Sequence, residues 1–390
     1  MSRAALHVVS SVPFYKEEVE LWSGESSKDA HSLHYVIAYP AAFRPELPAY
    51  FINRYTNKGD WVLDPFCGGG TTALEANLLG RRACASDINP LAMRVTRAKL
   101  EPVDLTDITL RLQLMNLKRP VPLNNYQRVY APFFDTDTFC EICNLRQALQ
   151  QNYDKVARFA ELLAASLLHG HSAGYFSVYT FPQLSLSPSE QERLNLKRRQ
   201  TPEYRAVVPR ILRKVAATQR DGYTSEFMRI IANNRLAVTD ACNLHYLPDA
   251  SIDLVVTAPP VLGRKESVTE QWLRYWFFGI NPEGLEHKLC PVDSLEEWQE
   301  YMNGALLELA RVLKPGRRAV LDLREVLWRG RSVFLDEEVQ QIINDSLGRF
   351  WEAECLLLQK EQYAKLKHCL KSRDVAGHEK RHRLLVLRRR

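Results

Sequence analysis

Short apolar runs and amphipathic stretches alternate in two separate parts of the chain. Four apolar runs predict buried strands, at residues 61–64, 83–87, 236–240 and 251–256. Apolar positions with helical spacing follow the first two runs, at 71–79 and 90–100. Gly80 suits the end of the first helix, and Pro90 suits the first turn of the second. Strands that alternate with helices are typical of a mainly parallel, doubly wound sheet.

The last part of the chain continues this pattern. Apolar spacing predicts a helix over residues 295–313 and a strand over 319–323. Two further apolar runs, at 350–359 and 383–387, suit a terminal antiparallel hairpin. Residues 1–30 show only weak periodicity, so we expect them to be irregular. The predicted fold class is therefore α/β, with a doubly wound, mainly parallel sheet of seven strands.

The regular alternation breaks between residues 101 and 235, which we interpret as an inserted helical and basic region. The sheet domain would then consist of a first half, 1–100, and a second half, 236–390. Inside the insertion, residues 156–168 predict a helix with one apolar face. An aromatic strip follows it and suits either a small core or stacking on bases: Tyr175, Phe176, Tyr179 and Phe181.

The composition is that of a soluble globular protein. Of the 390 residues, 46% are hydrophobic and 25% are charged. Apolar runs all fall short of the roughly 20 residues that span a bilayer, and the N-terminus lacks an apolar leader, so a cytoplasmic protein is expected. The C-x-x-C pair Cys140 and Cys143 has no second pair, and His169 and His171 have no evident third ligand, so we predict no metal site.

Positive charge is concentrated in one stretch of the insertion. The formal net charge is +6, and residues 193–214 carry eight basic side chains against Glu203 alone. The last twenty residues carry eight basic side chains against two acidic ones. Such clusters suit a polyanion, although a solvated helix face has the same composition. The candidate nucleic-acid contacts are Lys197, Arg198, Arg199 and Arg205.

A glycine turn follows the strand at 61–64. Gly68 and Gly70 allow a sharp turn and a close approach to a ligand. The pattern lacks the lysine of a phosphate loop and the third glycine of a dinucleotide turn. Asp64, just before the glycines, repels a pyrophosphate and favours a cationic ligand with amine donors, such as S-adenosylmethionine. Asp87 and Asp240 close two further strands, where carboxylates can accept from ribose hydroxyls and from an adenine amino group.

The segment 64–72, Asp-Pro-Phe-Cys-Gly-Gly-Gly-Thr-Thr, with Asp87-Ile-Asn-Pro90 after it, resembles the amino-methyltransferases that modify N4 of cytosine or N6 of adenine in DNA. The match covers about 31–100 and 236–325. It implies the class I methyltransferase sheet, S-adenosylmethionine as cofactor, and DNA methylation, as in restriction-modification, with RNA as the nearest variant. The implied cofactor contacts are Tyr39, Phe43, Asp64, Pro65, Phe66, Cys67, Gly68, Gly70, Thr71, Thr72, Asp87, Ile88, Asp240 and Ala241.

The catalytic loop of this family departs from its pattern in this chain. The family has Asp, Asn or Ser, then Pro-Pro and an aromatic residue, whereas the sequence here is Ala258-Pro259-Pro260-Val261. An exocyclic amino nitrogen is a poor nucleophile. It reacts when protein acceptors bind its hydrogens and an aromatic side chain stacks on the base and fixes its orientation. Ala258 cannot accept a hydrogen bond and Val261 cannot stack, although the Pro259 carbonyl can still accept.

Two interpretations of this loop stay open at the level of sequence. Side chains nearby could replace the missing groups: Thr257, Trp272, Tyr275, Trp276 and Phe277. The four on residues 272–277 could instead be helix core. In the first case the protein is a nucleic-acid amino-methyltransferase. In the second it is a cofactor-binding relative with lost or altered chemistry. A methyltransferase for a small molecule or a protein is a third hypothesis.

Overall fold

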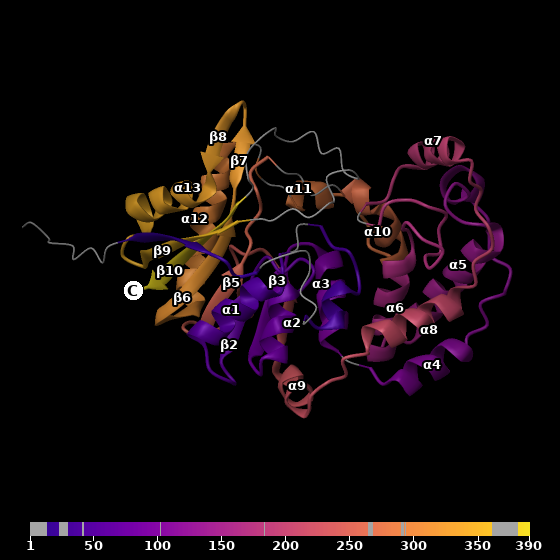
Figure 1. Ribbon diagram of the computed structural model, residues 1–390, viewed down its shortest axis with the longest axis horizontal. Coiled ribbons are helices and arrows are strands. Elements are labelled where there is room, and N and C mark those ends of the chain that lie inside the picture. Colours follow the sequence, from indigo (N-terminus) through magenta and orange to yellow (C-terminus); the bar gives the residue numbers. More distant parts are fainter. Residues whose placement is uncertain are drawn as a thin grey trace, which may run out of the picture.

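A single large sheet forms the centre of the molecule in the computed structural model, which describes residues 14–22, 30–40, 43–101, 103–182, 184–263, 268–289, 292, 294–360 and 381–390. Eight strands lie in the order β1-β9-β10-β6-β5-β2-β3-β4. They are β1 (Tyr15–Val19), β2 (Trp61–Asp64), β3 (Arg82–Asp87), β4 (Arg235–Val238), β5 (Ile252–Thr257), β6 (Leu313–Leu323), β9 (Trp351–Lys360) and β10 (Arg381–Arg389). Figure 1 shows this arrangement.

The strand directions confirm the predicted class I methyltransferase sheet. Strands β4, β3, β2, β5 and β6 are parallel to one another, and β10 is antiparallel to both β6 and β9. All six residues of β5 are buried. A continuous apolar strand of this kind is buried on both faces, which requires helices above and below it.

Two layers of helices cover the two faces of the sheet. One face packs against α1 (Glu46–Tyr55), α2 (Thr71–Leu78) and α3 (Pro90–Leu100). The other packs against α12 (Leu295–Val312) and α13 (Leu335–Ile342). Val62, Val256 and Val320 face the first layer, whereas Leu63 and Val255 face the second, as the alternation along strands requires.

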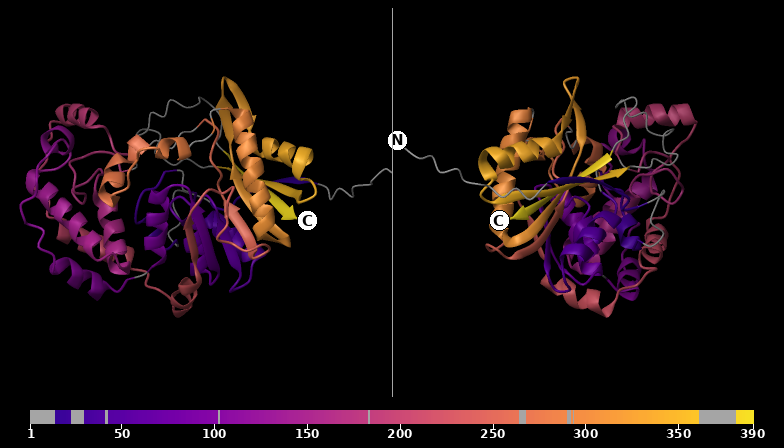
Figure 2. Two further views of the ribbon diagram at one scale, coloured as in Figure 1. Left: turned by 180° about the vertical axis from the view of Figure 1, so that it is seen from behind. Right: turned by 60° about the vertical axis from the view of Figure 1, so that its left-hand side comes forward.

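The helices of residues 105–218 gather beyond α3, to one side of the sheet (Figures 1 and 2). They are α4 (Leu105–Gln113), α5 (Thr136–Gln151), α6 (Lys155–Leu167), α7 (Pro188–Arg198) and α8 (Val207–Thr218). Helix α10 (Trp272–Phe278) joins this group, and α9 (Ser225–Ile230) leads back to the sheet. Buried residues of α6 such as Phe159 and Leu163 belong to the same core as α3, so this helical group is continuous with the sheet layer.

The structure corrects the sequence analysis at the N-terminal edge. Residues 15–19, predicted to be irregular, form β1, which is parallel to β9 and adds an eighth strand to the predicted seven. A short hairpin of β7 (Glu325–Trp328) and β8 (Arg331–Phe334) was also not predicted. Helix α11 (Leu285–Leu289) lies between α10 and α12 in the chain. Among the described residues, none of the helices is long and apolar enough to cross a membrane.

Candidate cofactor and catalytic site

The glycine turn after β2 is held in place by its neighbours on two sides. The backbone N–H of Gly68 donates to the Asp87 carboxylate at the end of β3, over 2.9 Å. From α3, the Thr96 hydroxyl donates to the Gly68 carbonyl over 3.2 Å, and the buried Lys99 ammonium donates to the Gly69 carbonyl over 2.7 Å. Burial lowers the pKa of Lys99 to about 8. Side chains of α3 therefore fix the turn by donating to the carbonyl groups of Gly68 and Gly69.

The turn requires glycine for both conformation and space. Gly68 and Gly70 have φ of 46° and 77°, in the left-handed region that favours glycine. A Cβ at Gly70 would lie 2.6 Å from the Thr96 hydroxyl oxygen. A Cβ at Gly69 would lie 3.1 Å from the Cβ of Tyr39, which covers the turn from the other side. The backbone of this turn is thus enclosed between α3 and the segment that contains Tyr39.

Asp64, at the end of β2, joins the glycine turn to the catalytic strand. Its carboxylate accepts a 2.5 Å hydrogen bond from the Thr257 hydroxyl at the end of β5 and a 3.2 Å bond from the Phe66 N–H. Burial raises the pKa of Asp64 to about 6, although these hydrogen bonds lower it. The Thr72 hydroxyl of α2 donates to the Val256 carbonyl over 3.1 Å, so the helix after the turn is tied to β5 as well.

The other two predicted acids also lie at the carboxyl end of the sheet. Asp87 ends β3 and accepts, besides Gly68, the N–H of Asn89 over 2.8 Å. Asp240 follows β4 and accepts from the Cys242 N–H at 2.9 Å and from the Tyr301 hydroxyl at 3.2 Å. Carboxylates at the ends of β2, β3 and β4 thus form one edge, where ligands of such sheets bind.

The segment before α1 covers this edge. Buried His34 is hydrogen bonded to Glu75 of α2, with 2.7 Å between Nε2 and Oε1, and burial lowers the pKa of His34. Tyr39 lies against the glycine turn, and the Asn89 amide donates to its hydroxyl over 3.5 Å. Arg274 of α10, buried as well, donates to the Ala38 carbonyl over 2.8 Å. The segment is thereby fastened to both α2 and α10.

The remaining predicted cofactor residues lie in or beside this turn, but several have buried side chains. Phe43 and Cys67 belong to the core, and burial raises the pKa of the Cys67 thiol, so that thiol stays protonated. Thr71 and Ala241 are buried, and Ile88 packs partly against the core. The last two residues of the predicted set, Pro65 and Phe66, lie in the backbone between the end of β2 and the glycines.

The loop predicted to be catalytic, residues 258–261, follows β5 and is fixed by contacts on both faces of the sheet. Ala258 is half-buried and packs against the core on the face of α1, α2 and α3. The Trp298 indole N–H of α12 donates to the Pro260 carbonyl over 2.8 Å, which fixes the second proline. Val261 packs against the core of the opposite face. Neither Ala258 nor Val261 therefore offers a polar or aromatic group to a base, and Pro259 is buried.

The aromatic residues of α10 act mainly in packing. Phe277 and Tyr275 are buried, and the Tyr275 hydroxyl donates to the Asn89 side-chain oxygen over 3.1 Å. The Trp272 indole N–H donates to the Leu186 carbonyl, and Trp276 is stacked on Phe139 of α5. These contacts favour the interpretation of residues 272–277 as helix core.

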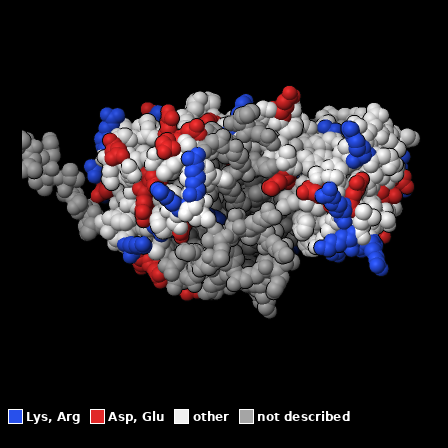
Figure 3. Space-filling model, turned by 90° about the horizontal axis from the view of Figure 1, so that it is seen from above, with Lys and Arg blue, Asp and Glu red and all other residues white. Residues whose placement is uncertain are grey.

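The predicted basic contacts separate into two kinds. Lys197, Arg198 and Arg199 are exposed at the end of α7, and the Arg198 guanidinium lies 3.6 Å from the centre of the Tyr179 ring. Figure 3 shows Lys and Arg gathered at this end of the molecule. Arg205 is a correction, because it is buried and donates to the carbonyl groups of Ser172, Tyr175 and Ser177. Its guanidinium fastens a loop and faces no solvent.

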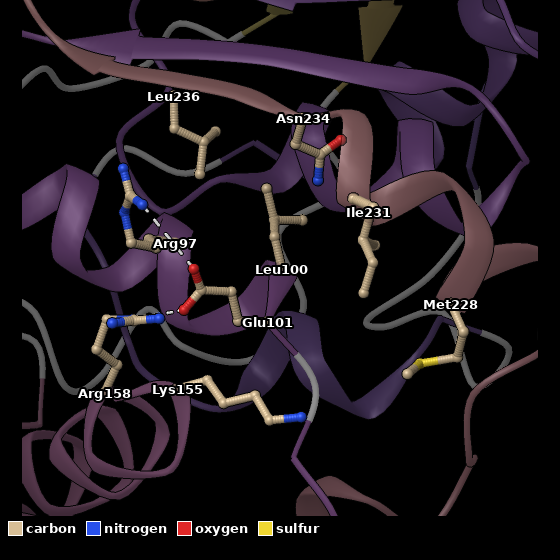
Figure 4. A pocket seen from close by; sticks show the side chains of 10 residues that line it. Arg97, Leu100, Glu101, Lys155, Arg158, Met228, Ile231, Asn234 and Leu236 are labelled. Atoms are coloured by element: carbon tan, nitrogen blue, oxygen red, sulfur yellow. Dashed lines mark hydrogen bonds and ion pairs between the residues drawn. The ribbon is translucent and has the colours of Figure 1, made fainter. Parts of the chain in front are cut away.

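Other chemistry-bearing residues of the insertion serve structural roles. Burial lowers the pKa of His169 to about 3, and its ring nitrogens contact the Phe181 carbonyl and the Ser185 hydroxyl. Phe176 of the aromatic strip is buried. A hollow of about 540 Å³ lies between α3, α6 and α9 at the amino end of β4, away from the predicted cofactor residues (Figure 4). Its rim carries Arg97, Glu101, Lys155 and Arg158.

The sheet, the glycine turn and the acids at the strand ends together define a class I methyltransferase fold. Residues 5–97 match the sequence profile of a family described as DNA methylase. Residues 5–97 are thus similar to this family, as the resemblance in sequence predicts.

Individual relatives match over this segment. Type II methyltransferase M.MjaII of Methanocaldococcus jannaschii is 32% identical over 93 residues, which are 24% of this chain and 17% of that protein. The tRNA (guanine(10)-N2)-dimethyltransferase of Methanothermobacter thermautotrophicus is 39% identical over 70 residues, 18% of this chain and 21% of that protein. The chain therefore spans about a fifth of the length of these curated relatives.

Solved structures add little to this comparison. The rRNA methyltransferase aviRa of Streptomyces viridochromogenes covers 95% of this chain and 91% of its own length, at 12% identity and a TM-score of 0.31. A score of this size does not carry an argument about fold or function. The fold assignment therefore depends on the strand order and directions of this protein itself.

Proposed function

We propose that this protein is an S-adenosylmethionine-dependent methyltransferase that acts on an exocyclic amino group of a nucleic-acid base, with DNA as the favoured substrate. The observation that carries the proposal is the glycine turn enclosed between Asp87, α3 and Tyr39, with the carboxylates of Asp64 and Asp240 at the same edge. The cofactor supplies a methyl group on a sulfonium. The protein's own residues bind the cofactor and the base, orient them, and accept the proton that the amino group loses.

The donors of such a cofactor fit the acceptors of the site. An ammonium group fits the buried carboxylate of Asp64, because a buried acid without a cation prefers its protonated form. Two ribose hydroxyls fit Asp87, whose carboxylate already holds the turn, and an adenine amino group fits Asp240. A pyrophosphate would meet three carboxylates instead of donors.

The cofactor assignment is tested by titration calorimetry with three compounds. S-adenosylmethionine and S-adenosylhomocysteine are expected to bind with similar affinity, whereas ATP is expected not to bind, because its phosphates would be repelled. Asp87→Ala should reduce the affinity for both adenosyl compounds by about tenfold or more, the loss of one or two charge-assisted hydrogen bonds. Binding of ATP in preference to S-adenosylmethionine would contradict the assignment.

We propose DNA as substrate because the matching profile is described as DNA methylase and several relatives are type II methyltransferases. We propose residues 101–235 as the recognition region. Lys197, Arg198 and Arg199 support this role, since they are exposed and Arg198 lies over an aromatic ring. RNA is the second substrate class, favoured by the relative that modifies tRNA. A nucleic-acid substrate also favours a cytoplasmic protein. Residues 371–380, the first half of the basic C-terminal stretch, lie outside the described residues.

A cofactor-binding protein with lost or altered chemistry is the alternative from another class. Ala258 and Val261 are the specific observation in its favour, since neither side chain can perform the task of its counterpart in the family. Loss of one positioned hydrogen-bonding group commonly costs about 10² to 10³ in rate. Cofactor binding without methyl transfer to DNA or RNA is the result that distinguishes this alternative.

A further inference from the structure

A buried acid–base pair lies near the carboxyl end of the strand next to the catalytic loop. Asp322 is the penultimate residue of β6, and both of its carboxylate oxygens lie 2.9 Å from Nδ1 of His382 on β10. The Asp322 side chain is 0% exposed and that of His382 is 5% exposed. The resemblance to the amino-methyltransferases does not assign a role to either residue.

The strand register leads toward a pairing of Asp322 with Ala258. In the parallel pair of β5 and β6, Thr257, the last residue of β5, is opposite Leu321, and a further step of the same register would bring Ala258 next to Asp322. Val256 and Val320, one step before Thr257 and Leu321, face the layer of α1, α2 and α3. Since side chains alternate along a strand, Ala258 and Asp322 share that face as well.

The same face contains the cofactor edge. Val62 of β2 belongs to this layer, and Asp64 two residues later therefore points to the same side as Asp322. Asp64 is tied to Thr257, the residue before Ala258. The strand ends of β2, β5 and β6 thus present, in spatial order, a carboxylate, an alanine and a second carboxylate.

Packing alone does not explain the Asp322–His382 pair. A buried charged pair is often no more stable than apolar residues of similar volume, because desolvation offsets the attraction. The next residue of β10, Arg383, forms a second buried pair with Asp336 of α13, on the opposite face of the sheet. The basic members of the two pairs, His382 and Arg383, are consecutive on β10, and both pairs are buried. Only the Asp322–His382 pair lies on the α1, α2 and α3 side of the sheet, where Ala258 packs.

The surroundings of the pair come from the N-terminal edge of the sheet. The Trp22 ring meets the His382 ring edge-on, with 5.3 Å between centroids. The Gln359 amide donates to the Trp22 carbonyl over 3.4 Å, and the Arg44 guanidinium lies 5.5 Å from the Trp22 ring centre. Trp22, which follows β1 in the chain, therefore covers the His382 ring.

We propose that Asp322, oriented by His382, supplies the hydrogen-bond acceptor for the target amino group that position 258 lacks, an inference that rests on the proposed function. The amino N–H donates to the carboxylate, and the nitrogen electron pair forms a bond to the methyl carbon. The carbon–sulfur bond breaks and its electron pair returns to sulfur. The methylated nitrogen then loses one proton to the Asp322–His382 pair.

The placement is tested first without catalysis, by a double-mutant cycle on thermal stability. A carboxylate at position 258 would be next to Asp322, where like charges repel, whereas a neutral amide would not suffer this repulsion. We expect Ala258→Asp to lower the melting temperature by several degrees more than Ala258→Asn. In the Asp322→Asn background this difference should vanish. An equal difference in both backgrounds would overturn the proximity of the two positions.

The role is tested by rate. Asp322→Asn is expected to lower kcat by about 10² to 10³, as for other single positioned groups, and to leave the dissociation constant of S-adenosylmethionine within twofold. The matched control is Asp336→Asn, which breaks the second buried pair on the opposite face and should keep kcat. Equal losses in both variants would assign Asp322 a structural role. A wild-type protein without transfer would overturn the proposed function and this role with it, whereas active wild type with active Asp322→Asn overturns this role alone.

Discussion

The hydroxyl of Thr257 donates a 2.5 Å hydrogen bond to the buried carboxylate of Asp64. The last residue of the catalytic strand is thereby tied to the residue that precedes the glycine turn. A change at either residue reaches both halves of the site, although the two are 193 positions apart in the chain. The predictions below begin with this contact.

Replacement of Thr257 by valine removes the donor and keeps the shape of the side chain. The Asp64 carboxylate then loses its shortest hydrogen bond in a buried site, and we expect the free energy of unfolding to fall by about 1–3 kcal/mol. Denaturant unfolding measures this change. Thr257→Ser retains the hydroxyl and should lie closer to wild type. Equal stability of the valine variant and wild type would contradict the importance of this bond.

Cofactor affinity should depend on pH through Asp64. Burial raises the pKa of Asp64 to about 6. Because the folded-state pKa is above the unfolded value of 3.8, the stability that this group contributes is present below about pH 4 and is lost as the pH rises through 6. An ammonium-bearing cofactor needs the charged form, so its affinity should have the opposite trend.

We therefore expect the affinity for S-adenosylmethionine to fall as the pH drops below about 6, by up to tenfold per pH unit. Calorimetric titrations between pH 5 and pH 8 measure the effect. Asp64→Asn should bind more weakly at pH 8 and lose this pH dependence. A wild-type affinity that is flat over this range would contradict a charge-based contact of the cofactor with Asp64.

Gly70→Ala should abolish cofactor binding. The new Cβ would lie 2.6 Å from the Thr96 hydroxyl, at a φ of 77° that alanine adopts with difficulty. Gly222→Ala is a matched control, because Gly222 has a φ of 66° and a Cβ there would meet nothing within 4 Å. Both variants store backbone strain, but only the first should lose binding. Similar affinities in the two variants would contradict a ligand role for the turn.

Lys99→Met tests whether α3 positions the glycine turn. The methionine side chain fits the apolar surroundings but leaves the Gly69 carbonyl without its ammonium donor. We expect cofactor affinity to fall by about tenfold, the value of one charge-assisted hydrogen bond. Lys155→Met, at the rim of the hollow beside α3, removes an exposed lysine and should leave affinity unchanged. Equal affinity in the two variants would assign Lys99 to packing alone.

Charge reversal at Lys197, Arg198 and Arg199 should weaken nucleic-acid binding and reduce its salt dependence. The slope of log K against log salt is negative, and each lost phosphate contact makes it shallower by roughly 0.7 to 0.9. Fluorescence anisotropy with a labelled oligonucleotide at several salt concentrations measures the slope. Reversal at Arg54 and Lys58, exposed at the amino end of the sheet, is the control. An unchanged slope in the triple variant would exclude α7 from the interface.

The sequence predicted the elements whose signals are local. The glycines, the acids at strand ends and the periodicity of residues 61–100 gave β2, α2, β3 and α3 almost to the residue. Here tertiary contacts agree with local preference, because the turn is set by left-handed backbone angles and the strands by their burial.

Long-range pairing could not be predicted in this way. Strand β1 is exposed along most of its length, and its burial pattern has no period of two, so only its register with β9 makes it a strand. Arg205 looked like its basic neighbours in sequence, but three carbonyl acceptors from residues 172–177 bury it. Asp322 and His382 are 60 positions apart, and their pairing depends on the antiparallel register of β6 with β10.

The most direct test of the proposed function is transfer of tritium from methyl-labelled S-adenosylmethionine to duplex DNA, single-stranded DNA and RNA, with the Gly70→Ala variant as control. The account predicts that wild-type protein labels an exocyclic amino group of a base, with DNA preferred, and that Gly70→Ala does not. Calorimetric binding of the cofactor by wild type, with no label in any of the three substrates, would contradict it.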